Sequence, residues 1–105
     1  MEMVIYTIQN GRIKKMKNEI YEITDNQDIN NTFKLVGEFQ LHEFLITQIW
    51  YEIERLQNWQ NNMNEDKMNE IFKLKEDINN IRLKKWNYKD VKNKLKTYDY
   101  IIKRV

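Results

Sequence analysis

The stretch YKDVKNKLKTYDYIIKRV, residues 88–105, decides how the fold of this chain is predicted. Its apolar residues recur at intervals of three and four, which is the spacing of one buried stripe on a helix. These residues are Tyr88, Val91, Leu95, Tyr98, Ile102 and Val105. Basic residues fill many of the positions between them. The sequence therefore predicts a helix that runs to the last residue, with an apolar side on the core and a cationic side facing away.

The same spacing predicts two more helices upstream of this tail. In the first, which begins near Leu41, the apolar positions of one face are Leu45, Ile46, Ile49, Ile53 and Leu56. In the second, the apolar positions are Met68, Ile71, Phe72, Leu74, Ile78 and Ile81. Asn64 stands just before the second helix. It is a good N-cap, because its side chain can accept a hydrogen bond from a backbone N–H of the first turn.

The helical phase slips at residues 85–87, where Lys85 takes a position that the upstream pattern would make apolar. Two interpretations remain open. The helix can break and restart, with Asn87 as its N-cap and Asp90 in the first turn. Alternatively, one long helix is locally overwound. We favour the break.

The beginning of the chain has the pattern of strands. Residues 3–9 alternate and are rich in β-branched side chains, which favours a strand. Asn10 and Gly11 follow, and Asn-Gly is the strongest short signal of a two-residue hairpin. In that hairpin Ile8 would face Ile13, and Ile5 would face Met16.

Residues 12–24 also fit a helix, because their apolar positions are spaced three, four and three. Residues 24–32 are polar and rich in Asp and Asn, so a loop is predicted there. Residues 33–37 predict another short strand. The fold class that follows is α+β, with a small antiparallel sheet of two or three strands followed by two or three antiparallel helices. The alternative, if residues 12–24 are helical, is an all-α bundle.

Length and composition bound the class of protein. A chain of 105 residues has the size of one domain. We expect residues 1–105 to form a single domain, with a β-rich part at 1–38 and a helical part at 41–105. The chain has no Cys, which excludes disulfides and thiolate chemistry. It has neither an apolar run long enough for a membrane span nor a basic leader, so a cytoplasmic location is expected.

Charge is segregated along the chain although the net charge is only +2. Most of the charged residues within 38–71 are acidic, whereas most of the charged residues within 82–105 are basic. The basic block consists of Arg82, Lys84, Lys85, Lys89, Lys92, Lys94, Lys96, Lys103 and Arg104. It could pair with the acidic helix, stay solvated, or bind an anionic partner such as a nucleic acid or an acidic protein.

A second candidate site lies on the helix that begins near Leu41. Phe44 and Tyr51 fall roughly opposite its apolar seam, and Trp50 lies near the rim of this pair. If the helix is sandwiched in the core, these side chains fill space. If it is not, they form a patch for a protein partner or for a second copy of the chain.

The sequence offers no catalytic centre. His42 is the single histidine, and one His without Cys does not make a metal site. Helical spacing places it on the side of Leu45, at the edge of the core. The two glycines are isolated, so no glycine-rich phosphate loop is predicted. We expect no enzyme activity, no metal and no cofactor.

The function that the sequence favours is a small non-catalytic binding protein that docks on a macromolecular partner. Asn, Ile and Lys make up about two-fifths of the chain and Ala is absent, a composition typical of AT-rich coding. A phage or mobile-element inhibitor of host or defence machinery, similar in role to an anti-CRISPR protein, is the concrete version, acting in the host cytoplasm. The alternatives are a nucleic-acid-binding regulator that uses the basic block and a self-assembling structural module, such as a homodimer.

Overall fold

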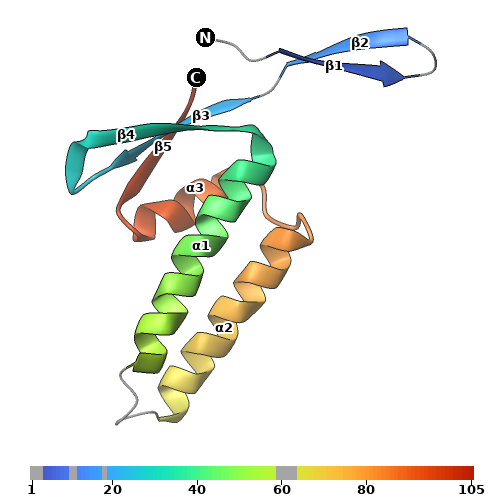
Figure 1. Ribbon diagram of the computed structural model, residues 1–105. Coiled ribbons are helices and arrows are strands. Elements are labelled where there is room, and N and C mark those ends of the chain that lie inside the picture. The colour runs from blue at the N-terminus through green and yellow to red at the C-terminus, as the bar shows by residue number, and fades with distance from the viewer. Residues whose placement is uncertain (1–3, 10–11, 18, 59–63) are drawn as a thin grey trace.

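The computed structural model describes residues 4–9, 12–17, 19–58 and 64–105, which form an α+β fold (Figure 1). The elements are, in chain order, β1 (Val4–Gln9), β2 (Arg12–Lys17), β3 (Ile20–Asp25), β4 (Asp28–Val36), α1 (Gly37–Asn58), α2 (Glu65–Arg82), α3 (Tyr88–Thr97) and β5 (Tyr100–Arg104). The predicted fold class is confirmed, and the all-α alternative is wrong.

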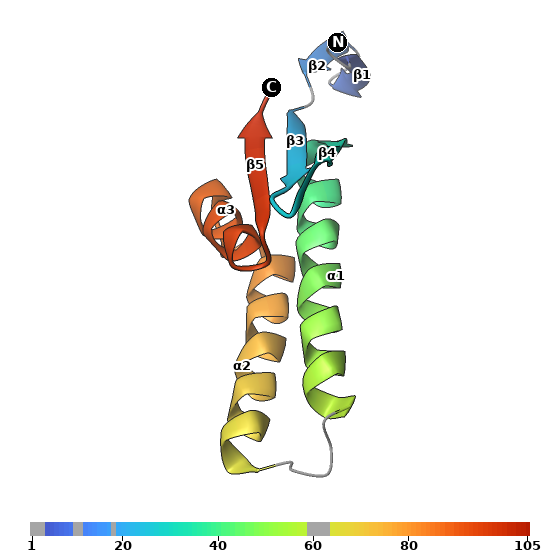
Figure 2. The ribbon, with the colours of Figure 1, turned by 90° about the vertical axis from the view of Figure 1, so that its left-hand side faces the viewer.

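Strands β1 and β2 form an antiparallel hairpin that projects beyond the rest of the molecule (Figures 1 and 2). Ile8 pairs with Ile13 and Ile5 pairs with Met16, as the sequence predicted. The predicted Asn10-Gly11 turn itself lies outside the described residues. Because residues 12–17 and 20–25 are strands, a helix over 12–24 is wrong.

A second sheet has three antiparallel strands in the order β4-β3-β5. The central strand pairs Ile23 with Phe33 on one side and with Ile102 on the other. One edge of the sheet is thus formed by β5, a strand from the last residues of the chain, which lies beside α3 (Figure 2). The prediction of a helix through Val105 is therefore wrong from Tyr100 onward, and so is the expectation that residues 41–105 are all helical.

The chain leaves the helix at Asp99, whose φ of 64° is in the left-handed region and cannot continue α3. The residues that follow are apolar and β-branched, which suits a strand. Ile102 is 3% exposed, whereas its neighbours Ile101 and Lys103 are exposed. Burial of Ile102 satisfies both the helical spacing and the strand alternation, which is why the two patterns could not be separated at this position.

The loop predicted for residues 24–32 is also wrong in part. Strand β3 continues to Asp25, and β4 begins at Asp28 after a tight turn. Residues 28–32 are exposed and lie on the edge strand of the sheet, so polar side chains are compatible with strand structure there. The strand predicted at residues 33–37 is confirmed as the end of β4.

The core lies where the inner side of the sheet meets the helices. Helix α1 begins at Gly37, whose φ of 84° turns the chain sharply out of β4. It then runs antiparallel to α2 (Figure 1). The fully buried side chains are Ile23, Leu41, Leu45, Ile49, Ile53, Ile81, Val91 and Leu95. The apolar seams predicted for α1 and α2 supply most of this core.

Two predicted helix starts are confirmed by their caps. The Asn64 side chain accepts a 2.9 Å hydrogen bond from the backbone N–H of Lys67. Asn87 and Asp90 form a reciprocal capping box, with bonds of 2.9 and 3.1 Å. The break between α2 and α3 is therefore confirmed, and the single overwound helix is wrong.

The environments of Phe44 and Tyr51 differ although both lie away from the seam of α1. Phe44 is half-buried between helix and sheet, where its ring contacts Phe33 and Tyr100 in edge-to-face geometry. Tyr51 is 62% exposed. Phe44 therefore fills space in the core, as expected if the helix is sandwiched between other elements.

We predict that Phe44→Ala lowers the free energy of unfolding by about 2–4 kcal/mol, because it removes a ring packed between two others. Tyr51→Ala should lower it by less than about 1 kcal/mol, because that ring loses little contact. Urea denaturation of both variants measures the difference. Equal losses would show that the two side chains do not differ in packing as described.

Candidate docking surfaces

The basic block of the sequence does not form one surface. Its nine members lie on three elements and the connection between two of them, and their surroundings differ. Arg82 ends α2, Lys84 and Lys85 lie in the connection to α3, Lys89, Lys92, Lys94 and Lys96 lie on α3, and Lys103 and Arg104 lie on β5.

Three lysines of α3 form a continuous cationic surface, which we call the lysine face: Lys89, Lys92 and Lys96. Their spacing of three and four residues places them on one side of the helix, and all three are exposed. None of them makes an ion pair with an acidic residue in the described part of the chain. The carboxylate of Asp90, the acidic residue of the first turn of α3, accepts a hydrogen bond from the Asn87 N–H in the capping box.

Lys94 belongs to the interior side of α3 instead. Its ammonium lies 3.6 Å from the Asp77 carboxylate and 5.5 Å from the centre of the Tyr98 ring. Both members of this ion pair are about four-fifths buried as side chains. The pair ties α3 to α2, so Lys94 serves the fold, although part of its side chain also lines a surface pocket with Trp86 and Asn93.

The two basic residues of β5 point to opposite sides of the sheet. The guanidinium of Arg104 lies 3.8 Å from the centre of the Tyr88 ring, which is a close cation–π contact. Lys103 pairs in register with Glu22 of β3 on the outer side of the sheet. Lys103 therefore does not join the lysine face, whereas Arg104 lies beside the first turn of α3.

Most of the aromatic residues that interleave with the basic block pack against other side chains of the protein. The rings of Tyr88 and Tyr21 are stacked with centroids 5.9 Å apart, and Tyr100 packs on Phe44. Trp86 is half-buried against the core. Tyr88 and Tyr100 are therefore held by other rings of the protein, whereas Trp86 also lines a surface pocket on α3.

A second surface lies along the groove between α1 and α2, on the flank away from α3. One pocket, at the start of α1, is lined by Phe39, His42, Ile46, Arg82 and Lys84, among others. Another, at the far end of the groove, is lined by Gln57, Met68, Ile71, Phe72 and Lys75. Trp50 follows Ile46 by one helical turn and precedes Gln57 by two, which places it between the pockets.

We call this surface the groove face and define its apolar part by four side chains. The exposed fractions are 77% for Phe39, 42% for Trp50, 61% for Met68 and 75% for Phe72. The helical spacing of α2 had placed Met68 and Phe72 with the core, and this was wrong. These side chains lie beside the two pockets and leave apolar surface exposed along the groove.

The patch predicted from Phe44, Trp50 and Tyr51 is not assembled as one surface. Phe44 packs under the sheet, and Trp50 lies on the groove face. Tyr51 lines a shallow pocket with Tyr98 and Tyr100 on the other flank of α1. Helical spacing had assigned two of the four apolar residues of the groove face, Met68 and Phe72, to the buried side of α2. No feature of the sequence singled out Phe39.

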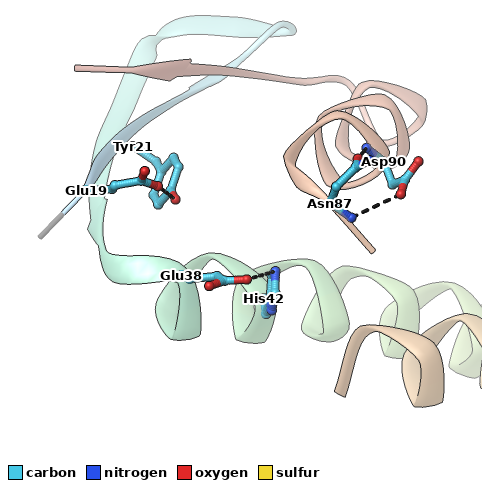
Figure 3. Close-up of polar contacts among 6 residues, drawn as sticks. All are labelled: Glu19, Tyr21, Glu38, His42, Asn87 and Asp90. Carbon is cyan, nitrogen blue, oxygen red and sulfur yellow. Dashed lines mark hydrogen bonds and ion pairs between the residues drawn. The ribbon is translucent and has the colours of Figure 1, made fainter. Parts of the chain in front are cut away.

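His42 is 8% exposed at the edge of the core, where the sequence placed it. Its Nε2 atom lies 3.6 Å from a Glu38 carboxylate oxygen, one turn earlier on α1 (Figure 3). Among the described residues, no cluster of His, Cys, Asp and Glu is arranged to hold a metal ion. In the part of the chain that the structure describes, every buried side-chain nitrogen or oxygen atom has a hydrogen-bond partner.

Two tyrosines donate hydrogen bonds to carboxylates: Tyr98 to Glu52, and Tyr21 to Glu19 (Figure 3 shows the latter pair). Burial raises the pKa of the Tyr98 phenol well above its usual range, and the bond to Glu52 raises it further. Burial and the bond to Glu19 raise the pKa of Tyr21 in the same way. Both phenols therefore stay neutral and act as donors. The Tyr98 bond joins the end of α3 to α1, whereas the Tyr21 bond is local to the start of β3.

Comparison with known proteins adds no assignment to these surfaces. No protein-family model, curated protein sequence or solved structure matches the chain. Within the described residues, no helix has both the length and the apolar content that crossing a membrane requires.

We predict that the stability of the protein falls as the pH rises above about 10, where a tyrosine of the unfolded chain ionises. The folded state keeps the protons of Tyr98 and Tyr21, so ionisation favours the unfolded state. Tyr98→Phe should make this decline shallower, and Tyr21→Phe should act in the same direction. Urea denaturation at a series of pH values measures it. Curves for wild type and variants that stay parallel above pH 10 would contradict the prediction.

Proposed function

We propose that the protein is a non-catalytic binding protein that docks on an acidic surface of a protein partner through the lysine face of α3. The observation that carries the proposal is that Lys89, Lys92 and Lys96 lie exposed on one side of a helix whose other side is fixed in the core. Exposed cations in a row attract an anionic surface at long range and orient the encounter.

The rigidity of this helix supports the proposal. The capping box fixes the start of α3, Val91 and Leu95 anchor its buried side, and the Lys94–Asp77 pair joins it to α2. A partner therefore meets lysines whose backbone positions are already set. Less conformational freedom is lost on binding when the binding surface is ordered beforehand.

An acidic protein surface fits the lysine face better than a nucleic acid does. The face consists of lysines, which act as point charges and give no bidentate readout of bases. The nearby rings of Tyr88 and Tyr100 pack on other side chains of the protein, which takes them away from base stacking. Phosphate contacts by three lysines alone would give weak and strongly salt-dependent binding.

The biological setting that we propose is inhibition of host or defence machinery by a protein encoded on a phage or mobile element, in the host cytoplasm. An anti-CRISPR-like role is one instance. Its support is compositional: the chain is small, rich in residues with AT-rich codons, and has no proposed catalytic group. Blocking a partner by docking requires a surface and no chemistry, which the lysine face provides.

The test compares two double variants that lose the same charge. Lys92→Ala/Lys96→Ala removes two members of the lysine face, whereas Lys34→Ala/Lys73→Ala removes two exposed lysines of β4 and α2. After capture from a nuclease-treated host extract, the partner should be bound by wild type and by the Lys34/Lys73 variant. The Lys92/Lys96 variant should bind it about tenfold more weakly or worse, from the loss of two charge contacts.

Two results would contradict the proposal. In the first, both double variants lose the partner equally, which would indicate a net-charge effect rather than a site. In the second, nuclease treatment abolishes capture and labelled duplex or single-stranded DNA binds wild type with a steep salt dependence. That result would favour the nucleic-acid-binding regulator instead.

A further inference from the structure

An open pocket on α3, which Trp86 helps to line, lies beside the lysine face. We propose that this pocket holds an aromatic side chain of the partner, while acidic residues near that side chain lie on the lysine face. The docking segment of the partner is then an acidic stretch of chain with an aromatic residue in it. This proposal rests on the proposed function and extends it from the charge of the partner to the kind of segment that binds.

The pocket and the lysine face are neighbouring sides of one helix. Besides Trp86, the pocket is lined by Asp90, Asn93, Lys94 and Thr97. Asp90, Asn93 and Thr97 are three and four residues apart, which places them on one side of α3. At 3.6 residues per turn, Asn93 lies only about 40° from Lys89 around the helix axis. A partner that contacts the lysine face therefore also reaches the rim of the pocket.

The Trp86 ring suits an anchoring contact because the fold already holds it. The ring is half-buried and packs against the core, yet it also lines the pocket. A second ring placed in the pocket could contact it in the offset or edge-to-face geometry that aromatic pairs prefer. Because Trp86 is held before the partner arrives, little conformational freedom is lost on binding.

The charges in the pocket wall indicate that the group inside the pocket is uncharged. The Lys94 ammonium already pairs with the Asp77 carboxylate at 3.6 Å, so mainly the methylenes of Lys94 remain for a guest. The Asp90 carboxylate, which accepts a hydrogen bond from the Asn87 N–H, would repel a carboxylate placed in the pocket. The acidic groups of the partner therefore lie outside the pocket, over the lysine face.

The distances suit an extended segment of the partner. A helix with its side chains is about 10–12 Å across, so its neighbouring sides lie within about 10 Å of each other. In an extended chain, side chains two positions apart point to the same side and are about 7 Å apart. Acidic residues two positions from the aromatic residue therefore come close to the lysine face, and the long lysine side chains span the rest.

The two halves of the surface have different tasks. Exposed ion pairs contribute little affinity each, but they speed the encounter and make it depend on salt. An aromatic side chain in a pocket is the kind of contact that supplies most of the affinity of an interface. The lysine face would therefore attract and orient the acidic segment, and the pocket would hold it.

A single-stranded nucleic acid fits this surface less well than an acidic segment does. Such strands bind where several rings stack on successive bases. Trp86 lines the pocket, but Tyr88 and Tyr100 are held by other rings of the protein. A base in the pocket would also bring its own phosphate close to the Asp90 carboxylate, which would repel it. The acidic residues of a peptide can instead stand away from the aromatic one.

The first experiment compares two labelled peptides that differ at one position. Both have glutamates on either side of a central residue, which is phenylalanine in one peptide and alanine in the other. Fluorescence anisotropy with the full chain should give a dissociation constant about tenfold smaller for the phenylalanine peptide, because only this peptide fills the pocket. In NMR spectra, this peptide should also shift the indole N–H signal of Trp86, and the alanine peptide should not.

The second experiment fills the pocket from its own wall. Thr97 is exposed and its hydroxyl donates to the Lys94 carbonyl, so Thr97→Phe places a ring in the pocket at little cost to the fold. The matched control is Thr47→Phe, because Thr47 is an exposed threonine of α1 whose hydroxyl donates to the Glu43 carbonyl. Thr97→Phe should weaken the phenylalanine peptide about tenfold and leave its salt dependence unchanged, whereas Thr47→Phe should change neither.

A third variant guards against a new ring that turns away from the pocket. Trp86→Ala removes the wall itself and should weaken the phenylalanine peptide as Thr97→Phe does. Urea denaturation identifies the temperature at which this variant is folded, and the titration is made there. Lys92→Ala/Lys96→Ala should act differently, because it should weaken both peptides and flatten their salt dependence.

Three outcomes would overturn the proposal. The two peptides bind wild type equally, Thr97→Phe and Trp86→Ala both bind the phenylalanine peptide as Thr47→Phe does, or a single-stranded oligonucleotide binds more tightly than that peptide and depends on Trp86. If the peptides bind equally but both depend on Lys92 and Lys96, the proposed function stands and the pocket contact is wrong. If neither peptide depends on these lysines, the proposed function is wrong and this proposal with it.

Discussion

The central strand β3 depends on a partner at each edge, and the second partner comes from the far end of the chain. Ile23 is fully buried, with Phe33 and Ile102 as its neighbours across the sheet. Without β5, the inner side of β3 would lose one of its two flanking strands and expose that core position. Strand β5 also fixes the position of α3, because only two residues separate the end of the helix from the start of the strand. The position of the lysine face is therefore a consequence of strand pairing as much as of helix packing.

Much of this fold could be predicted from the sequence because the strong signals are local. Asn64 and Asn87 mark helix starts by their own side chains, and the seams of α1 and α2 repeat over several turns. The register of β1 and β2 also followed from a two-residue turn. The C-terminal strand could not be predicted in this way, because Ile102 is buried under either periodicity. What decides between helix and strand there is the pairing with β3, a contact between residues about eighty positions apart, and no local pattern records it.

The candidate sites could be predicted less well, for a related reason. Charge counts located a basic block, but they could not show that Lys94 pairs with Asp77 while Lys92 and Lys96 remain exposed. Helical spacing placed Phe72 near the seam of α2, yet the width of a buried stripe depends on which neighbours cover it. In this chain α1 covers the centre of the stripe and α3 covers one flank. Met68 and Phe72 lie on the flank that neither helix covers.

The lysine face and the groove face lie on opposite flanks of the helical pair. Asp77 and Glu52 face α3 through Lys94 and Tyr98, whereas the pockets of the groove face open on the other flank. A partner that docks on the lysine face would therefore leave the groove face uncovered. The core seam of α1 and α2 separates the two surfaces, so a substitution on one of them leaves the side chains of the other in place.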